Sequence, residues 1–283
     1  MVKLFICSIV QQAACIEGET GIGKTSSSVV FSLSKPFNKG YQLLNFSEGT
    51  KISDTFGNIT VIDNQIQHID KPLTISMKQG NVFIADEFNI SKIMDSCAIA
   101  LERDINKKVI IPGTGEKIKI HPGFQFIICQ NEITTIGRKE IPPSIASKII
   151  KIKYPNSDLD LIESICLNIA DNIISTHGKF TDDHKSFAKN LANYMFLLNK
   201  SDKICFKKWS IRDIKKLYKR IYQNDNKNII GVSKIHHIVF YTMSSVLPQN
   251  EEVALDEIRN NLELSFKLDQ SEIDNYINCY KAN

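Results

Sequence analysis

The first half of the chain carries short, continuous runs of apolar residues. These runs are Ala14 to Ile16, Leu43 to Phe46, Asn81 to Ala85, Phe124 to Cys129, and Ile149 to Ile152. Continuous apolar runs are typical of strands that are buried on both faces of a parallel sheet. Helical patterns lie between them, so the sequence predicts an α/β fold in which helices flank a parallel sheet.

A predicted hairpin interrupts this alternation between residues 108 and 120. Val109-Ile110-Ile111 and Ile118-Lys119-Ile120 flank the segment Pro112-Gly113-Thr114-Gly115. Two apolar runs around a Pro/Gly-rich turn are typical of paired antiparallel strands.

The spacing of apolar residues changes after Tyr154-Pro155-Asn156-Ser157. Apolar positions now recur at helical intervals, first at Leu159, Ile162 and Ile165, and later at Phe187, Leu191, Tyr194 and Leu198. Further helices are predicted over about 210–223, 234–247 and 251–266. We therefore expect an α/β domain at 1–153, followed by an all-helical domain at 154–283.

Composition excludes several classes of protein. Apolar residues make up 42% of the 283 positions, and the net charge of +4, from 35 basic and 31 acidic residues, is too small to imply nucleic acid as an obligate partner. The basic cluster around the helix predicted over about 210–223 fits a solvated helix face better than a nucleic-acid patch; it consists of Lys207, Lys208, Lys215, Lys216, Lys219 and Arg220. A globular protein is expected, with no direct sign of nucleic-acid binding. Seven cysteines without a C-x-x-C pair argue against a disulfide framework or a zinc site. The N-terminal apolar run is short and is broken at Gln11-Gln12, and no stretch approaches the ~20 residues that span a bilayer. We expect a soluble, intracellular protein with no membrane partner.

The strongest motif follows the first apolar run and reads Gly18-Glu19-Thr20-Gly21-Ile22-Gly23-Lys24-Thr25. It satisfies the P-loop pattern, in which glycines let backbone N–H groups turn towards phosphate oxygens. A helix is expected from Ser26 to Leu33, with its N-terminus facing the same anion. Lys24 would contact the β and γ phosphates, and Thr25 would offer its hydroxyl to Mg²⁺.

Two carboxylates end the run Val82-Phe83-Ile84-Ala85. In open α/β sheets, ligands bind beyond the carboxyl ends of the strands. Asp86 is therefore a candidate Mg²⁺ ligand, and Glu87 a candidate general base that polarises the attacking water. Ordinary acidic residues at a solvated strand end are the alternative interpretation.

Two further polar residues fit the same site. Asn131 follows the strand that ends near Cys129 and could orient the attacking water, although a turn asparagine is the simpler alternative. Arg212 lies in the first turn of a helix that Ser210 and Asp213 are expected to cap. A first-turn arginine opposes the helix dipole, and a phosphate partner would offset that cost.

These motifs, in this order, resemble those of AAA+ ATPases of the dynein-related (midasin and MoxR-like) group, and within it the midasin branch most of all. The resemblance rests on the P-loop, on the segments Asn45 to Gly57 and Gly80 to Asn89, and on His121 to Ile145 with its Asn131. The hairpin at 108–120 is similar to an insertion found in this clade, and Arg212 is similar to its sensor-2 arginine. The resemblance is strong over about 10–153 and weaker beyond.

The resemblance implies that ATP and Mg²⁺ bind between neighbouring modules of a ring. The expected partners are other AAA+ modules, as a homo-oligomer, a hetero-oligomer or the rest of a longer chain, together with a macromolecular complex to be remodelled. The midasin branch acts in ribosome biogenesis, which would imply a nuclear protein; otherwise a cytoplasmic location is expected.

One departure from the family bears on turnover. Family members usually read Ser-Arg-Phe before the last strand, and that arginine reaches the neighbour's γ phosphate. This sequence has Ser147-Lys148-Ile149, and lysine lacks the forked geometry of a guanidinium. Lys148 and Arg138 are both candidates for that catalytic role, while Arg138 could equally be a surface turn residue.

Two functions follow from these observations. The first is an ATPase that remodels a macromolecular complex, which the intact Glu87 favours. The second is a nucleotide-gated ring or scaffold subunit that binds ATP and hydrolyses it poorly, which Lys148 favours. A small-molecule kinase or GTPase fits less well, because the C-terminal half is helical and no guanine-reading N-K-x-D string occurs.

Overall fold

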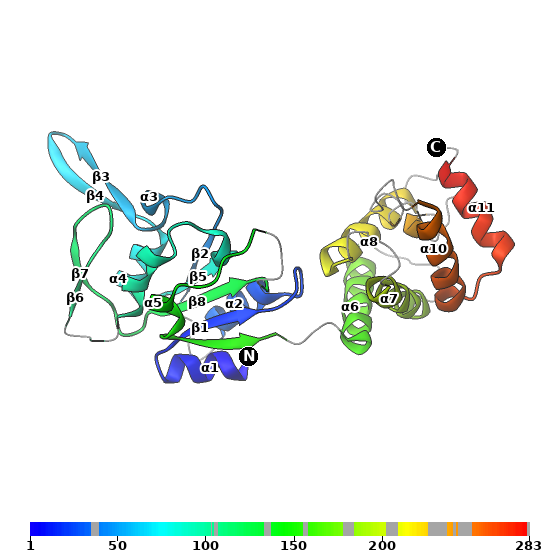
Figure 1. Ribbon diagram of the computed structural model, residues 1–283, viewed down its shortest axis with the longest axis horizontal. Coiled ribbons are helices and arrows are strands. Elements are labelled where there is room, and N and C mark those ends of the chain that lie inside the picture. The colour runs from blue at the N-terminus through cyan, green and yellow to red at the C-terminus, as the bar shows by residue number, and fades with distance from the viewer. Residues whose placement is uncertain are drawn as a thin grey trace. The chain divides into compact units, whose positions relative to one another are not determined.

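The computed structural model describes residues 1–34, 40–102, 104, 107–132, 137–154, 158–177, 184–201, 209–225, 237–239, 242 and 251–281. The chain divides into two compact units, Met1–Asn156 and Ser157–Asn283. Each unit is described by itself (Figure 1).

A five-stranded sheet, in which all pairs of neighbours are parallel, forms the centre of the first unit (Figure 1). Its strand order is β2-β5-β8-β1-β9. The strands are β1 (Ala13–Glu17), β2 (Tyr41–Asn45), β5 (Val82–Asp86), β8 (Gln125–Gln130) and β9 (Ile149–Lys153). Each overlaps one predicted apolar run, so the α/β fold expected from the sequence is confirmed.

Both faces of the sheet are buried against helices. On one face, α1 (Val2–Ile9) and α2 (Lys24–Leu33) share a core with alternate strand residues such as Ile16 and Ile84. On the other face, α4 (Pro72–Gln79) and α5 (Pro143–Ala146) pack with the opposite set, which includes Phe83 and Phe126. The short 3-10 helices η1 (Phe88–Ile90) and η2 (Asp95–Leu101) complete this second layer. Burial on both faces explains why the three central strands β1, β5 and β8 read as unbroken apolar runs, whereas the edge strands β2 and β9 are partly exposed.

Two antiparallel hairpins extend from this unit. The predicted one is confirmed as β6 (Lys108–Ile110) paired with β7 (Lys117–Lys119). The second hairpin, β3 (Gly57–Ile62) with β4 (Gln65–Asp70), follows α3 (Ile52–Thr55) and was not predicted from the sequence. Its turn residues Asp63 and Asn64 both have positive φ, at 51° and 58°, as a two-residue type I′ turn requires.

Gly57 is the position in this hairpin where a side chain is least tolerable. Its φ is +126°, and an added Cβ would lie 2.1 Å from the carbonyl oxygen of Ile69 on the paired strand. Gly57→Ala should lower the free energy of unfolding by about 2–3 kcal/mol, because backbone must move to relieve the clash.

Gly115 provides the matched control for Gly57→Ala. It also has positive φ, at +70°, but an added Cβ meets nothing within 4 Å. Gly115→Ala should therefore cost only about 1 kcal/mol for the left-handed backbone. Urea unfolding of both variants measures the difference, and equal losses would contradict the steric explanation.

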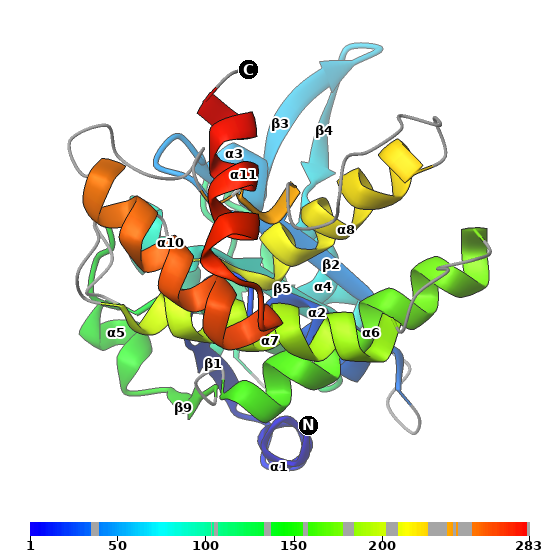
Figure 2. The same cartoon turned by 90° about the vertical axis from the view of Figure 1, so that its right-hand side faces the viewer.

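The second unit is helical in its described part (Figure 2). It contains α6 (Leu159–His177), α7 (His184–Lys200), α8 (Ile211–Asp225), α10 (Glu251–Phe266) and α11 (Gln270–Lys281). α7 contacts both α6 and α10, and α6 also contacts α8. Large aromatic side chains, including Tyr194, Tyr218 and Trp209, fill the shared core. Most of the helix predicted over 234–247 lies outside the described residues.

Helix α8 has the amphipathic pattern that the sequence predicts. Its apolar stripe, which includes Ile214, Leu217 and Tyr218, is buried, whereas Arg212 is exposed. The Asp213 carboxylate accepts hydrogen bonds from the backbone N–H of Ser210 at 2.8 Å and from its hydroxyl at 2.6 Å. The Asp213 side of the predicted cap therefore forms, and Arg212 lies exposed in the first turn.

Candidate functional site

The strand order brings three polar segments to one edge of the sheet. Strand β8 lies between β1 and β5, and all three run parallel. Glu17 at the end of β1 is level with Gln130, and Asp86 at the end of β5 is level with Cys129. The loop after β1, the carboxylates after β5 and the asparagine after β8 must therefore meet at the carboxyl edge, where α/β sheets bind ligands.

The loop between β1 and α2 has the backbone conformation that the glycine pattern predicts. Gly21 and Gly23 have φ values of +80° and +98°, and Gly23 immediately precedes the first residue of α2. Left-handed residues at a helix N-terminus turn consecutive N–H groups towards one point, which favours an anion there. This loop fits a phosphate group, as its sequence suggests.

Lys24 connects the loop to the neighbouring strand. Its ammonium Nζ donates hydrogen bonds to the carbonyl oxygens of Gly18 at 2.8 Å and Glu19 at 2.7 Å, and to Oδ1 of Asn131 at 2.8 Å. Burial lowers the pKa of Lys24, and the carboxylates of Glu87 and Asp86 oppose that change. A buried ammonium within a loop of N–H groups is suited to bind a polyanion.

Thr25 and Asp86 form a pair of oxygen ligands beside this lysine. The Thr25 hydroxyl donates to Oδ2 of Asp86 at 2.8 Å. Adjacent ligands of an octahedral Mg²⁺ ion at ~2.1 Å lie about 3 Å apart, and carboxylate and hydroxyl oxygens are the ligand types it prefers. The spacing and chemistry of these two groups therefore fit Mg²⁺.

Glu87 and Asn131 are in direct contact. The Asn131 amide nitrogen donates to Oε1 of Glu87 at 3.1 Å and to Oε2 at 3.3 Å, while its amide oxygen accepts from Lys24. Because the lysine can only donate and the carboxylate can only accept, this network fixes which way the amide of Asn131 points. Lys24, Asn131 and Glu87 thus form one continuous chain of hydrogen bonds.

Arg138 is the second partner of Glu87. Its Nη1 donates to Oε2 of Glu87 in an ion pair, and the arginine side chain is only 12% exposed. The alternative of a surface turn residue does not fit this burial. A direct role for Arg138 at a neighbour's phosphate stays a prediction.

Lys148 and Arg212 are the remaining two predicted site residues. Lys148 is exposed and immediately precedes β9, whose first residue is level with Ala13 at the amino edge of the sheet. It therefore lies at the edge opposite the P-loop of its own chain. Arg212 belongs to the helical unit, and its approach to the P-loop stays a prediction.

Tyr154, Ser27 and Asn89 support the site, although the sequence did not predict a role there for any of them. Tyr154 contacts both the P-loop and α2. Its hydroxyl lies 2.6 Å from the hydroxyl of Ser27 in α2, and its Cβ would lie 2.9 Å from a Cβ added at Gly18 in the P-loop. The first glycine of the motif is thus needed because Tyr154 packs against it. The side-chain amide of Asn89 donates to the backbone carbonyl of Asn131 at 3.0 Å, which supports the residue that contacts Lys24 and Glu87. Sequence offered only one clue to these roles, namely that Asn89 lies within a segment that resembles the family.

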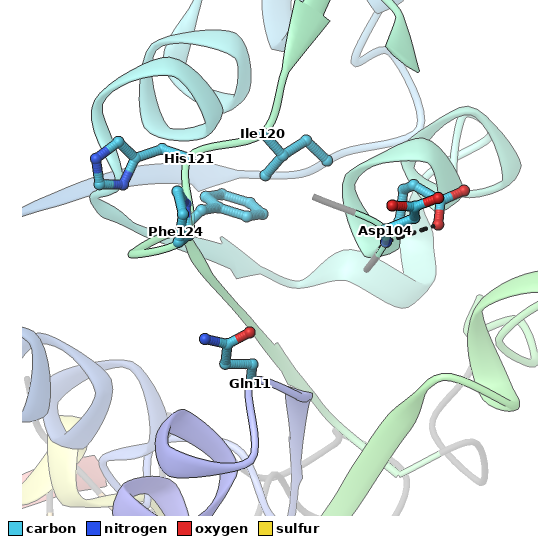
Figure 3. Close-up of a pocket in the computed structure, with 7 residues that line it drawn as sticks. Gln11, Asp104, Ile120, His121 and Phe124 are labelled. Atoms are coloured by element: carbon cyan, nitrogen blue, oxygen red, sulfur yellow. Dashed lines mark hydrogen bonds between the residues drawn. The ribbon is translucent and has the colours of Figure 1, made fainter. Parts of the chain in front are cut away.

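A separate small pocket lies at the opposite edge of the sheet (Figure 3). Gln11 precedes β1 and Phe124 precedes β8, so both mark the amino ends of the strands. The pocket is therefore not part of the P-loop site. Its lining residues are Gln11, Glu102, Asp104, Ile120, His121, Pro122 and Phe124.

No helix in the described part of the chain is both long and apolar enough to cross a bilayer. The thiols of Cys7, Cys15, Cys97, Cys129 and Cys166 are free and buried. Burial raises the pKa of Cys97 and of Cys129 to about 12, so these thiols remain protonated near neutral pH.

Comparison with known proteins agrees with the geometry of the first unit. Residues 13–149 match the family model of the AAA domain of the dynein-related subfamily. A midasin from Giardia intestinalis is 30% identical over 158 residues, which are 54% of this chain and 3% of that protein. Uncharacterized proteins from Staphylococcus saprophyticus and Staphylococcus haemolyticus are each 26% identical over 183 residues, which cover 62% of this chain and 68% of theirs.

The matched region contains β1, the P-loop, the Asp86–Glu87 pair and Asn131, which are the parts that meet at the carboxyl edge of the sheet. Family, strand order and site geometry lead to the same assignment. Residues 13–149 of this chain form an AAA domain that belongs to the dynein-related subfamily.

Proposed function

We propose that this chain binds ATP with Mg²⁺, hydrolyses the γ phosphate and couples hydrolysis to remodelling of a macromolecular complex. The observation that carries the proposal is the hydrogen-bonded network at the end of three adjacent strands. In it, Lys24 contacts Asn131, Asn131 contacts Glu87, and Thr25 contacts Asp86. Each contact joins residues far apart in the sequence, and each residue has the chemistry that phosphoryl transfer to water requires.

Each part of the network has a role in this proposal. The loop from Gly18 to Gly23, together with Ser26 at the start of α2, surrounds the phosphates, and Lys24 neutralises their charge. Thr25 and Asp86 would hold Mg²⁺, which when bound would neutralise the negative charge that develops during phosphoryl transfer. Glu87 takes a proton from a water whose oxygen bonds to the γ phosphorus, while the bond from that phosphorus to the β–γ bridging oxygen breaks.

Assembly into a ring extends this proposal. AAA+ domains typically oligomerise in rings, in which one module completes the nucleotide site of the next. Lys148 is exposed at the edge away from its own P-loop, which supports a role at the site of another module. Arg212 would contact the phosphates from the helical unit. By resemblance to midasin, the remodelled complex would be a ribosome precursor and the location nuclear.

Lys148 also supports a second candidate function. A lysine provides charge without the forked contacts of an arginine finger, so turnover that depends on it would be slow. In that case the chain would be a nucleotide-gated ring subunit. Its phosphate release would stay low at every protein concentration, although ATP would still bind.

Removal of Mg²⁺ tests the proposed chemistry. Phosphate release by the purified chain with ATP should fall to background when EDTA replaces Mg²⁺. Asp86→Asn should lower the rate at least about tenfold with Mg²⁺ present, because it removes one charged ligand. Rates should be followed over a range of protein concentrations, since a ring that assembles gains specific activity as concentration rises.

Asp95→Asn is the control for Asp86→Asn. Asp95 is exposed at the start of η2 and accepts a hydrogen bond from Ser144 at 3.0 Å. This variant should keep the rate of the unaltered chain. Phosphate release that is the same with Mg²⁺ and with EDTA would reject the proposed function.

A further inference from the structure

The guanidinium of Arg138 lies on the Glu87 carboxylate of its own chain. Nη1 of Arg138 donates to Oε2 of Glu87, and the two side chains are 12% and 29% exposed. A charge-assisted contact that is largely withdrawn from water holds its geometry better than an exposed ion pair. Arg138 is therefore a fixed neighbour of Glu87.

The same carboxylate is held from a second direction. Asn131 donates to Oε1 at 3.1 Å and to Oε2 at 3.3 Å, and Lys24 fixes the amide from its other end. Glu87 thus lies between an amide and a guanidinium. Loss of either partner would let the carboxylate rotate about its side-chain bonds.

The backbone of Glu87 also requires support. Its φ is +55°, in the left-handed region that few residues other than glycine occupy, and its N–H donates to Oδ1 of Asp86 at 3.1 Å. Such conformations persist where the surroundings determine them, and they cluster at functional sites. The ion pair with Arg138 is one of the contacts that hold this residue in place.

The segment of Arg138 is linked through Asn89 to Asn131, the residue that follows β8. The next residue, Lys139, donates its backbone N–H to the Asn89 carbonyl at 2.9 Å, and the Asn89 amide donates to the Asn131 carbonyl at 3.0 Å. Asn89 is fully buried. Asn89 therefore joins the segment of Arg138 to Asn131, and these are the two residues whose side chains contact Glu87.

We propose that Arg138 is a positioning residue, which holds the Glu87 carboxylate of its own chain in the orientation that accepts a proton from water. This inference rests on the proposed ATPase function. It assigns Arg138 a role within its own subunit instead of a role at the phosphate of a neighbour.

Arg138→Gln tests the effect on turnover. The variant should lower kcat about tenfold, because misplacement of a catalytic group is costly even when binding is intact. KM for ATP should stay within about twofold, since the arginine does not hold the nucleotide. Arg138→Lys, which keeps the charge, should restore part of kcat. Lys92→Ala, at an exposed lysine that lies five residues after Glu87 in the sequence and pairs with Glu48 at 4.0 Å, should leave kcat unchanged.

A double-mutant cycle separates a role through Glu87 from a direct role at phosphate. In single-turnover experiments with ATP, Arg138→Gln should have less than about a twofold effect once Glu87 is already glutamine. An arginine that contacts phosphate, in its own subunit or in a neighbour, would keep its tenfold effect in that background. The second result would overturn the inference.

A thermal-unfolding cycle of the same variants tests the contact without any turnover. Arg138→Gln should lower Tm in the unaltered chain and lower it less in the Glu87→Gln chain. Equal shifts would mean that the two side chains do not interact, and this too would overturn the inference. Absence of Mg²⁺-dependent phosphate release by the unaltered chain would instead reject the proposed function, so the two failures are distinguishable.

Discussion

Glu87→Gln should lower steady-state phosphate release by roughly 10³-fold, within the range that general-base catalysis contributes. Glutamine has the shape of glutamate and can still accept from Arg138 and Asn131, but it cannot take a proton from water. The loop around Lys24 is untouched, so ATP should bind with an affinity close to that of the unaltered chain. Phosphate release and calorimetric titration with ATP measure the two quantities on the same samples.

Glu132→Gln is a suitable control for this change. Glu132 directly follows Asn131 and pairs with Lys153 at 3.5 Å. It carries the same charge near the same strand end, so its loss should change the rate less than about twofold. Similar rates for the unaltered chain and the Glu87→Gln variant would exclude Glu87 as the base and would favour the nucleotide-gated subunit.

The sequence predicted the central sheet well because burial leaves a strong local signal. The run Phe126-Ile127-Ile128 is buried on both faces, and its unbroken apolar pattern follows directly from that environment. Helix α8 was equally predictable, since its stripe repeats at helical spacing and Asp213 caps its start. In both cases one element's own residues contain the information.

The elements that were missed carry weaker local signals. Helix α1 buries Leu4 and Cys7 but leaves Ile6 and Ile9 exposed, so its apolar residues show no clean polar face. In the hairpin of β3 and β4, Val61 and Ile66 are 66% and 71% exposed, so burial does not impose an alternating pattern. Neither segment has a regular apolar period that marks one buried face.

The site residues also fall into two groups, those in local motifs and those brought together only by the fold. The P-loop and the Asp86–Glu87 pair are contiguous motifs, and their chemistry could be read from residue types. The contact between Arg138 and Glu87 depends on how Asn89 joins two chain segments, which no local pattern encodes. Tyr154 is similar, because its packing on Gly18 arises only when β9 pairs with β1.

Lys24→Met should weaken ATP binding by at least about 30-fold, because loss of one member of a buried charge pair costs about 2–5 kcal/mol. The Nζ atom lies among the Gly18 and Glu19 carbonyls and the Asn131 amide, in a site shielded from water. Electrostatic attraction to a triphosphate is stronger there than at the surface. Calorimetric titration with ATP and Mg²⁺ measures the change.

Stability of the Lys24→Met variant distinguishes lost binding from lost folding. Burial lowers the pKa of Lys24, so the folded state already disfavours its charged form, and removal of the charge should not unfold the domain. Without nucleotide, Tm should stay within about 4 °C of the unaltered chain, whereas ATP should no longer raise it. Lys71→Met, at an exposed lysine before α4, should keep the full shift with ATP. An ATP-dependent rise in Tm that survives in the Lys24→Met variant would show that the nucleotide binds elsewhere, and the P-loop assignment would then be wrong.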